Sequence, residues 1–328
     1  MSDGTSSLPA RAAIVGCGVI GAGWASRLHL RGVDISIADP SPAAADIFAE
    51  VTANAAEAWD ALGIATDGRG TVAFTDLVAA CADADLIVES VPERLDIKHS
   101  TLVAIDRAAP AGAIIASSTS GFTPSELADG VDGADRLIVG HPFNPVYLLP
   151  LVEVVASPAT TDEVIERTKA WYRGIGMHPL HVRREIPAHI ADRFLEAVWR
   201  EALWLVNDGV ATTEEIDDAI RYGFGLRWAQ MGLFETYRIA GGVGGMRHFI
   251  AQFGEALSWP WTKLMDTPEL TDELIDTIAD QSDAQSGHHS IRELERIRDR
   301  NLVGFLKVLE SNEWGAGTSV RALRDLAD

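Results

Sequence analysis

Basic side chains are scarce in this chain. Its 328 residues include 27 lysines and arginines against 48 aspartates and glutamates, so the formal net charge at pH 7 is −21. A surface with this charge repels nucleic acid and anionic membranes, and it gives no long-range attraction to an anionic substrate. We therefore expect no nucleic acid and no membrane among the partners, and we expect any bound anion to be held by individual arginines.

Cysteines are rare, and long apolar runs and metal-ligand spacings are missing. The sequence has two cysteines, Cys17 and Cys81, which is typical of a reducing compartment for a chain of this size. It has no run of about 18 apolar residues, the length that a membrane-spanning helix needs. The first ten residues are polar and lack the apolar segment of a signal peptide, so we expect a cytoplasmic location. Because no metal-ligand spacing is present, we expect no bound metal.

Apolar residues make up 47% of the chain, and in its first half they form short segments that alternate between strand and helix character. Because one hydrophobic core rarely grows beyond about 250–300 residues, a chain of this length is expected to form two domains. The alternation predicts an α/β fold with a doubly wound parallel sheet of the Rossmann type. The expected strands are 11–15, 33–38, 86–89, 113–117 and 137–140, and the expected helices are 19–30 and 94–108.

A glycine-rich turn joins the first expected strand to the first expected helix. Its pattern is Gly16-x-Gly18-x-x-Gly21, with Val19 and Ile20 opening the helix. The first glycine permits a tight turn, the second lets a pyrophosphate approach the backbone, and the third lets the helix pack against the strand. The pyrophosphate then lies at the helix N-terminus, where unpaired N–H groups point toward it. In this context the pattern predicts a dinucleotide site.

Asp39 ends the second expected strand, about 20 residues after the turn, where dinucleotide sites carry an acid. Such an acid accepts hydrogen bonds from the hydroxyls of the adenosine ribose and repels a 2′-phosphate. Residues 40–68 contain no lysine or arginine that could bind that phosphate. We therefore predict NAD rather than NADP as the cofactor. The alternative is a glycine turn followed by an unrelated surface aspartate.

Three polar segments begin where expected strands end: 89–93, 117–121 and 141–145. Ligands of open parallel sheets bind beyond the carboxyl ends of the strands. Any one of these segments is also typical of a soluble loop or a helix cap, but the three together favour a site. The last one starts a stretch from His141 to Glu153. A histidine with a carboxylate partner can remove a hydroxyl proton, so the pair and NAD together predict the oxidation of an alcohol.

From residue 186 onward the strand signals fade and apolar residues follow helical spacing. We expect an NAD-binding domain at 1–185 and an all-helical C-terminal domain at 186–328. Seven of the nine tryptophans lie at or after Trp171. Aromatic faces attract quaternary ammonium groups, although a single tryptophan is more often a core or interface residue. The expected helices are 190–207, 213–221, 269–280 and 291–310.

The order of these motifs resembles the 3-hydroxyacyl-CoA dehydrogenase superfamily over essentially the whole chain. The resemblance rests on the glycine turn, on Glu93 followed by Lys98, on Ser117 and on the stretch from His141 to Glu153. It implies that His141 is the general acid and base. It also implies that Glu153 orients the imidazole of His141 and stabilises the imidazolium.

The resemblance implies further roles for residues at the three strand ends. Ser117 is expected to bond the substrate oxygen, and Asn144 is expected to lie beside the nicotinamide. Glu93 and Lys98 are expected to line the cofactor side of the site. A homodimer formed through the helical domain is implied as well.

Two features depart from the pattern of the acyl-CoA enzymes. Where those enzymes have an asparagine that contacts the substrate oxygen, this chain has Asp192, whose carboxylate can donate a hydrogen bond only when it is protonated. The basic residues that hold the CoA nucleotide are also absent, because no lysine or arginine lies between Arg31 and Arg69. A CoA 3′-phosphate would lack its partner charges, which favours a small free acid as substrate.

Several segments more closely resemble a branch of the superfamily that oxidises L-carnitine: 90–94, 141–153, 199–205, 227–240 and 281–285. The implied reaction is oxidation of the C3 hydroxyl, with NAD as acceptor of the hydride. Aromatic rings and an acid suit the trimethylammonium group of carnitine, and an arginine suits its carboxylate. The candidates for the ammonium pocket are Trp228, Phe234, Tyr237 and Phe253, with Asp192 as the counter-charge.

Two other interpretations stay open at this stage. A dehydrogenase of another free 3-hydroxy acid, such as L-gulonate, would use the same cofactor turn and the same histidine and glutamate. The ring-rich region 227–261 favours carnitine over such a substrate. A protein that keeps the fold for a structural, crystallin-like role could also retain the cofactor turn, but the intact Ser117, His141 and Glu153 favour an enzyme.

Overall fold

The computed structural model describes residues 8–66, 68–241, 243, 245–253, 260–262, 269, 271–274, 276–277, 280–281 and 288–326. Its contacts divide the chain into two compact units. Unit 1 comprises Met1–Asp192 and Arg298–Asp328, and unit 2 comprises Arg193–Ile297. The sequence-based division instead placed everything after residue 185 in one helical domain.

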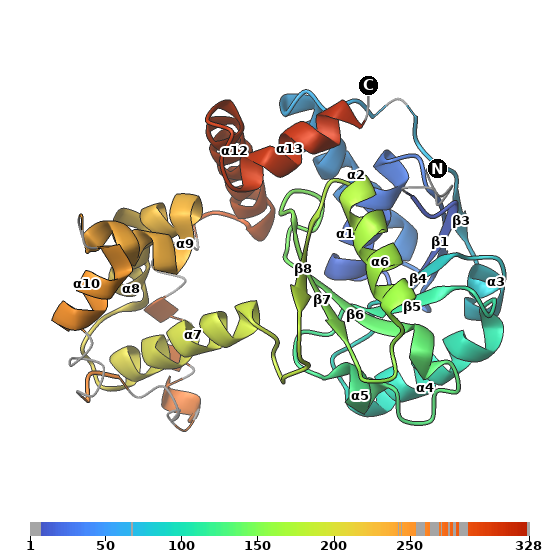
Figure 1. The fold of residues 1–328 in the computed structure, drawn as a ribbon, viewed down its shortest axis with the longest axis horizontal. Helices are drawn as coiled ribbons and strands as arrows, with labels where there is room; N and C mark the ends of the chain where they lie inside the picture. Colours follow the sequence, from blue (N-terminus) through green and yellow to red (C-terminus); the bar gives the residue numbers. More distant parts are fainter. Residues whose placement is uncertain are drawn as a thin grey trace. The chain divides into compact units, whose positions relative to one another are not determined.

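Unit 1 is built on one eight-stranded sheet with the order β3-β2-β1-β4-β5-β6-β7-β8 (Figure 1). All neighbouring strands are parallel except β6 and β7, which are antiparallel. The predicted α/β class is confirmed, but the strands expected from the sequence did not include β3, β7 or β8, and the antiparallel return was not expected. The strands are β1 (Arg11–Val15), β2 (Asp34–Ala38), β3 (Val72–Phe74), β4 (Leu86–Glu89), β5 (Ile114–Ser117), β6 (Leu137–Pro142), β7 (Leu151–Ala156) and β8 (His178–Val182).

Both faces of the sheet are covered, because alternate residues of each central strand belong to different apolar clusters. On one face Ile14 and its neighbours pack with Trp24 of α1 and Tyr172 of α6. On the other face Val15 and its neighbours pack with Leu102 of α4. The helices of these two layers are α1 (Val19–Leu30), α2 (Ala44–Ala61), α3 (Leu77–Cys81), α4 (Leu95–Ala108), α5 (Pro124–Leu127) and α6 (Asp162–Gly174). This arrangement is the doubly wound form, and it leaves the strand ends free for a site.

The C-terminal residues of unit 1 pack against its α2 layer. The helices α12 (Ile291–Ser311) and α13 (Ala316–Asp325) contribute Leu306 and Leu323 to a core shared with Trp59. The Arg324 guanidinium donates to the carbonyl of Leu62 at 2.5 Å. Burial of these apolar side chains explains why residues after 298 belong to unit 1.

Unit 2 is helical in its described residues. After α7 (Ala191–Asn207), whose first two residues belong to unit 1, it contains α8 (Thr213–Ala219), a π-helical turn (Ile220–Phe224), α9 (Gly225–Ala240) and α10 (Gly245–Phe253). The expected helix 269–280 lies partly outside the described residues, and residues 272–274 and 276–277 are helical. Among the described helices, none is long and apolar enough to cross a membrane.

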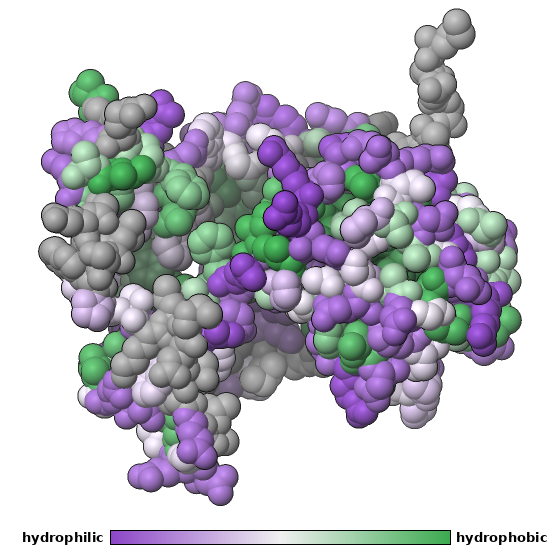
Figure 2. All heavy atoms as spheres, turned by 60° about the horizontal axis from the view of Figure 1, so that its bottom comes forward, coloured by the Kyte–Doolittle hydropathy of each residue, from purple (hydrophilic) through white to green (hydrophobic). Residues whose placement is uncertain are grey.

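Several large apolar side chains of unit 2 are exposed, and Figure 2 shows apolar side chains interrupting the polar surface of the face in view. Phe194, Trp199 and Phe234 are each more than half exposed. Exposed apolar surface on this scale is typical of a region that another surface covers.

Candidate active site

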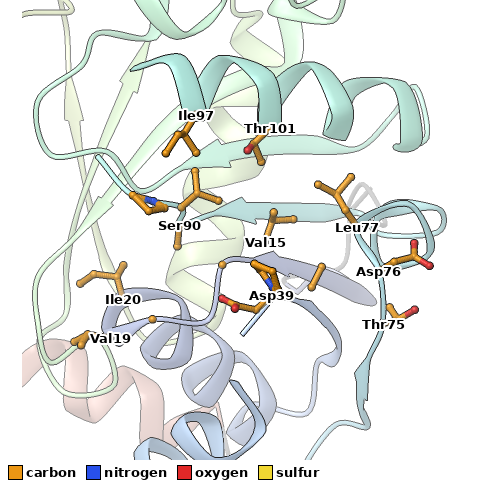
Figure 3. A pocket seen from close by; sticks show the side chains of 16 residues that line it. Val15, Val19, Ile20, Asp39, Thr75, Asp76, Leu77, Ser90, Ile97 and Thr101 are labelled. Atoms are coloured by element: carbon orange, nitrogen blue, oxygen red, sulfur yellow. The ribbon is translucent and has the colours of Figure 1, made fainter. Parts of the chain in front are cut away.

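The loop between β1 and α1 has the geometry of a dinucleotide cradle (Figure 3). Gly16 has a φ of +92°, and a Cβ there would lie 2.6 Å from the carbonyl oxygen of Ser90. A Cβ on Gly21 would lie 1.8 Å from the carbonyl oxygen of Gly16, so the helix can start close to the strand only without a side chain. A Cβ on Gly18 would meet nothing within 4 Å, which leaves the backbone open to a ligand. Gly16 and Gly21 thus have the geometry of the tight turn and of the helix–strand contact expected from the sequence, and the approach of a pyrophosphate at Gly18 stays a prediction.

A cleft of about 940 Å³ opens beside this cradle. Figure 3 shows Asp39 and Asp76 among the side chains around it. Asp39 accepts hydrogen bonds from the backbone N–H of Cys17 at 2.6 Å and of Ser41 at 2.7 Å, which fixes its carboxylate at the edge of the cleft. The lining residues are Val15, Gly16, Gly18, Val19, Ile20, Ala38, Asp39, Pro40, Thr75, Asp76, Leu77, Ser90, Val91, Pro92, Ile97 and Thr101.

The cleft fits NAD better than NADP. Asp39 and Asp76 are the charged residues among its lining, and none of the lining residues is basic. A ribose with free hydroxyls can donate to a carboxylate here, whereas a 2′-phosphate would meet two negative charges. The open backbone at Gly18, the N-terminus of α1 and Asp39 together match the pyrophosphate and the adenosine ribose of NAD.

A buried ion pair joins the ends of β4 and α4. The ammonium group of Lys98 lies 2.9 Å from Oε1 of Glu89 and 3.2 Å from Oε2 of Glu93. Glu89 is fully buried, and the exposed fraction of Lys98 is 1%. The backbone N–H of Val91 also donates to Glu89, at 2.8 Å. Lys98 therefore holds the turn after β4, which lines the cofactor cleft, rather than lining that cleft itself.

Glu93 connects this turn to the loop after β5. Its Oε1 accepts hydrogen bonds from the Thr119 hydroxyl and from the backbone N–H groups of Ser120 and Gly121, each of the latter at 3.1 Å. Burial alone would raise the pKa of Glu93, but the bond from Thr119 and the charge of Lys98 outweigh it and lower the pKa. Glu93 is therefore ionised at neutral pH and ties the two loops together.

Ser117 does not face an open space. It is fully buried, and its hydroxyl donates to Oε2 of Glu89 at 2.5 Å. The proton of this hydroxyl is thus donated to Glu89, and the expected bond between Ser117 and the substrate oxygen stays a prediction. Ser120, in the same loop, is partly exposed. Sequence reasoning singled out both segments, 89–93 and 117–121, but did not predict that Glu89 accepts the hydrogen bond of Ser117.

His141 and Glu153 are brought together by the antiparallel pairing of β6 and β7, where they are direct partners in the register. Nδ1 of His141 lies 3.0 Å from Oε2 of Glu153. The other oxygen of Glu153 accepts the backbone N–H groups of Ile190 and Ala191, at 2.9 and 3.0 Å. Glu153 is fully buried, and the exposed fraction of His141 is 4%.

The carboxylate of Glu153 is ionised at neutral pH. Burial would raise its pKa, but the hydrogen bonds from His141 and from the two backbone N–H groups outweigh burial and lower the pKa. An ionised carboxylate can only accept, so the Nδ1 of neutral His141 carries the proton. Its Nε2 is then an acceptor, as a general base requires.

Two other polar residues, Asp192 and His189, lie near the imidazole of His141, and a third, Asn144, follows His141 in the chain. Asp192 places its Oδ2 4.0 Å from Nε2 of His141. His189 is fully buried, with its ring centre 5.5 Å from that of His141 and its Nε2 3.3 Å from the carbonyl of Thr119. Burial and the neighbouring His141 lower the pKa of His189, so this ring is neutral. Asn144, just after β6, is exposed. His189 was not singled out from the sequence, since a lone histidine carries no pattern.

The four aromatic candidates for an ammonium pocket all lie in unit 2, and three of them take part in two groups of ring contacts among the described residues. Trp228 contacts Phe224, with ring centres 4.6 Å apart. Tyr237 stacks on Phe249 at 4.6 Å, and Phe249 contacts Phe253 at 4.9 Å. Phe234 is 71% exposed.

The fold and this geometry define an NAD-binding α/β protein with a histidine–glutamate pair at the strand ends. Residues 11–186 match the family model described as 3-hydroxyacyl-CoA dehydrogenase, NAD binding domain, and residues 189–279 match its C-terminal domain. The chain belongs to the 3-hydroxyacyl-CoA dehydrogenase family.

Curated relatives and solved structures agree with this assignment. The chain is 62% identical to an L-carnitine dehydrogenase/betainyl-CoA thioesterase of Ruegeria pomeroyi, over 93% of this chain but only 63% of that relative. It is 56% identical to an L-carnitine dehydrogenase of Mesorhizobium japonicum, over 94% of this chain and 86% of the relative. The chain thus spans less than two thirds of the length of some relatives.

A solved structure with a similar fold is that of 5-formyl-3-hydroxy-2-methylpyridine 4-carboxylic acid 5-dehydrogenase, an NAD⁺-dependent dismutase. It is 28% identical, with a TM-score of 0.76, and the match covers 92% of this chain and 98% of the other. The shared fold extends over both units of the present chain.

Proposed function

We propose that this chain oxidises L-carnitine to 3-dehydrocarnitine with NAD, and that His141 is the general base. The observation that carries the proposal is the buried pair of His141 and Glu153, where His141 lies near the carboxyl end of β6, at the sheet edge that also carries the cleft fitting NAD. Relatives with 56% and 62% identity are L-carnitine dehydrogenases, one of them also a betainyl-CoA thioesterase, which supports carnitine as the substrate.

In the proposed reaction Nε2 of His141 takes the proton of the C3 hydroxyl, and Glu153 stabilises the imidazolium. Glu153 can do so because its carboxylate is fixed by two backbone N–H groups and cannot turn away. When bound, NAD supplies the acceptor for the hydride that leaves C3. We propose that Asn144 lies beside the nicotinamide and that the loop after β5, which carries Ser117 and Ser120, borders the substrate oxygen.

Two features of the chain, a lack of basic residues and a set of aromatic residues, support a small zwitterion over an acyl-CoA as the substrate. No lysine or arginine occurs from residue 32 to residue 68, so the phosphates of CoA would lack partners near the adenosine site. The aromatic residues Trp228, Phe234, Tyr237 and Phe253 are the proposed partners of the trimethylammonium group. An arginine is expected to bind the carboxylate of the substrate.

We also propose that the chain forms a homodimer through unit 2. An apolar groove of about 460 Å³ runs between α7 and α8 and is lined by residues such as Val198, Leu205 and Ile216. Phe194 and Trp199 are exposed on the same helix, α7. A second copy would cover apolar surface that a monomer leaves in water.

The test is steady-state NADH formation with four substrates: L-carnitine, D-carnitine, L-gulonate and 3-hydroxybutyryl-CoA. We expect turnover with L-carnitine and very little with the other three. Saturation by micromolar acyl-CoA would overturn the proposed substrate, and preference for L-gulonate would reassign it to another free 3-hydroxy acid. No turnover with any of them, in a folded protein that binds NAD, would favour a structural role.

A further inference from the structure

The imidazole of His141 lies between two carboxylates. Glu153 from β7 contacts Nδ1 at 3.0 Å, and Asp192 from the first turn of α7 lies 4.0 Å from Nε2. The side chain of Glu153 is fully buried, whereas that of Asp192 is 22% exposed. Nε2 is the atom that takes the substrate proton in the proposed function, so Asp192 is the carboxylate on the reacting side.

The carboxylate of Glu153, which holds the imidazole of His141, also holds the backbone just before Asp192. The backbone N–H groups of Ile190 and Ala191, the two residues before Asp192, donate to Oε1 of Glu153. Just before them, Ala188 and His189 adopt positive φ angles of 60° and 48°, and the N–H of Ala188 donates to the carbonyl of Gly121. Asp192 therefore starts a helix that is anchored on the catalytic pair.

The distance between Asp192 and Nε2 decides what the carboxylate can do. At 4.0 Å the two atoms are too far apart for a direct hydrogen bond, which needs about 2.7–3.2 Å. A substrate hydroxyl has a single proton, and Nε2 and the carboxylate are both acceptors, so the proton that is donated to Nε2 cannot also be donated to Asp192. The charge of a carboxylate nevertheless acts at this range, because opposite charges within about 4–6 Å favour each other's ionised form.

We infer that Asp192 is a positioning residue for the proton transfer, and that its carboxylate stabilises the charge that His141 acquires at Nε2. This inference rests on the proposed function. In the step, the O–H bond of the substrate breaks and an N–H bond forms at Nε2. The hydride leaves C3 with its electron pair for oxidised NAD, so the alcohol becomes a ketone and NAD⁺ becomes NADH.

The other charged or titratable groups facing the imidazole do not replace Asp192 in this role. Glu153 acts on Nδ1, from the opposite side of the ring. His189, on the connection between β8 and α7, is buried and neutral and carries no charge to offer. In the part of the chain that the structure describes, Asp192 is thus the carboxylate on the Nε2 side of the ring.

The first experiment needs no substrate. The ionisation of His141 is followed by NMR of protein with labelled histidine, in the unmodified chain and in Asp192→Asn, with His141→Asn used to assign the signal. We expect the midpoint for His141 to fall by about 1 pH unit in Asp192→Asn, the usual effect of removing one nearby charge. Asp192→Glu, which keeps the charge, should retain most of the original midpoint. An unchanged midpoint in Asp192→Asn would overturn the inference, whether or not carnitine is the substrate.

The second experiment separates this role from that of an ammonium partner. The pH profile of kcat/KM is measured with L-carnitine and with its neutral isostere, in which trimethylammonium is replaced by tert-butyl. We expect Asp192→Asn to move the acid limb of the profile to lower pH with both substrates. A rise in KM for carnitine alone, with unmoved profiles, would make Asp192 the ammonium partner and overturn the inference. Glu196→Gln, an exposed carboxylate on the same helix, is the matched control.

Discussion

His141 and Glu153 are direct partners across the one antiparallel pair of strands in the sheet, β6 and β7. Twelve positions apart in the sequence, they are joined by a hydrogen bond of 3.0 Å in a buried site. An antiparallel pair places the side chains of opposed residues on the same face, so the strand return itself builds the pair.

Removal of the His141 imidazole should stop the proton transfer without affecting the cofactor. In His141→Ala we expect kcat to fall by about 10²–10⁴, the usual contribution of general acid–base catalysis. NAD affinity, measured by fluorescence titration, should stay the same, because His141 is absent from the lining of the cofactor cleft. Near-normal turnover in this variant would exclude His141 from the mechanism.

Glu153 should make the stability of the protein depend on pH at the acid end. Its pKa is lower in the folded protein than the ordinary value of about 4.5. The stabilisation is therefore fully present above that value and is lost as the pH falls through the lower, folded pKa. In Glu153→Gln this contribution is absent, so the difference in unfolding free energy between the two proteins should be largest at neutral pH and should shrink as the pH falls below about 4.5. Urea unfolding at several pH values measures this difference in unfolding free energy, with Glu196→Gln as control. A difference that stays constant with pH would contradict the lowered pKa of Glu153.

Asp39 should set the preference for NAD. In Asp39→Ser the ribose loses a charge-assisted hydrogen bond and a 2′-phosphate loses a repulsive neighbour. Such a bond contributes about 1.5–3 kcal/mol, so the ratio of kcat/KM for NAD over NADP should fall by about 10–100-fold. Asp76→Asn, which changes the other acid of the cleft, should have a smaller effect. Comparable use of both cofactors by the unmodified protein would rule out this role of Asp39.

The proposed aromatic pocket should recognise charge as well as shape. The tert-butyl isostere of carnitine keeps the shape and removes the positive charge. Cation–π attraction contributes about 0.5–2 kcal/mol, so kcat/KM should fall by about 3–30-fold with the isostere. Individual substitutions of Trp228, Phe234, Tyr237 and Phe253 would then identify the rings that cause the difference. Equal reaction rates for both compounds would show that the pocket recognises shape alone.

The buried pair of Glu89 and Lys98 should be important for stability as well as for the site. Glu89→Gln leaves a buried ammonium with Glu93 as its remaining carboxylate. We expect a loss of about 3 kcal/mol in unfolding free energy, the lower end for a broken buried pair. The double variant Glu89→Gln with Lys98→Met should recover part of this loss, since no buried charge is left. Glu166→Gln, which breaks the exposed pair with Lys169, is the control and should change stability little.

The sequence by itself determined the features that depend on neighbours along the chain. The glycine turn requires its three glycines at fixed spacing, and the strand β1, the helix α1 and the strand β4 have the predicted bounds. Asp39 could be predicted as well, because its distance from the turn follows from the length of one strand–helix–strand unit. The acid-rich composition and the lack of lysine and arginine between Arg31 and Arg69 led us to expect neither a CoA ester nor nucleic acid as a ligand.

Only the tertiary structure decided which polar side chains meet. Ser117 is in the segment that the sequence singled out, yet it is bound to Glu89 from the neighbouring strand, and Lys98 is buried against the same carboxylate. The bonds from Ile190 and Ala191 to Glu153, and with them the place of Asp192, depend on how β7 returns and where α7 begins. The C-terminal helices join unit 1 because they bury apolar residues against α2. Local periodicity specifies elements, but such pairings come from packing between residues far apart in the chain, which no local pattern encodes.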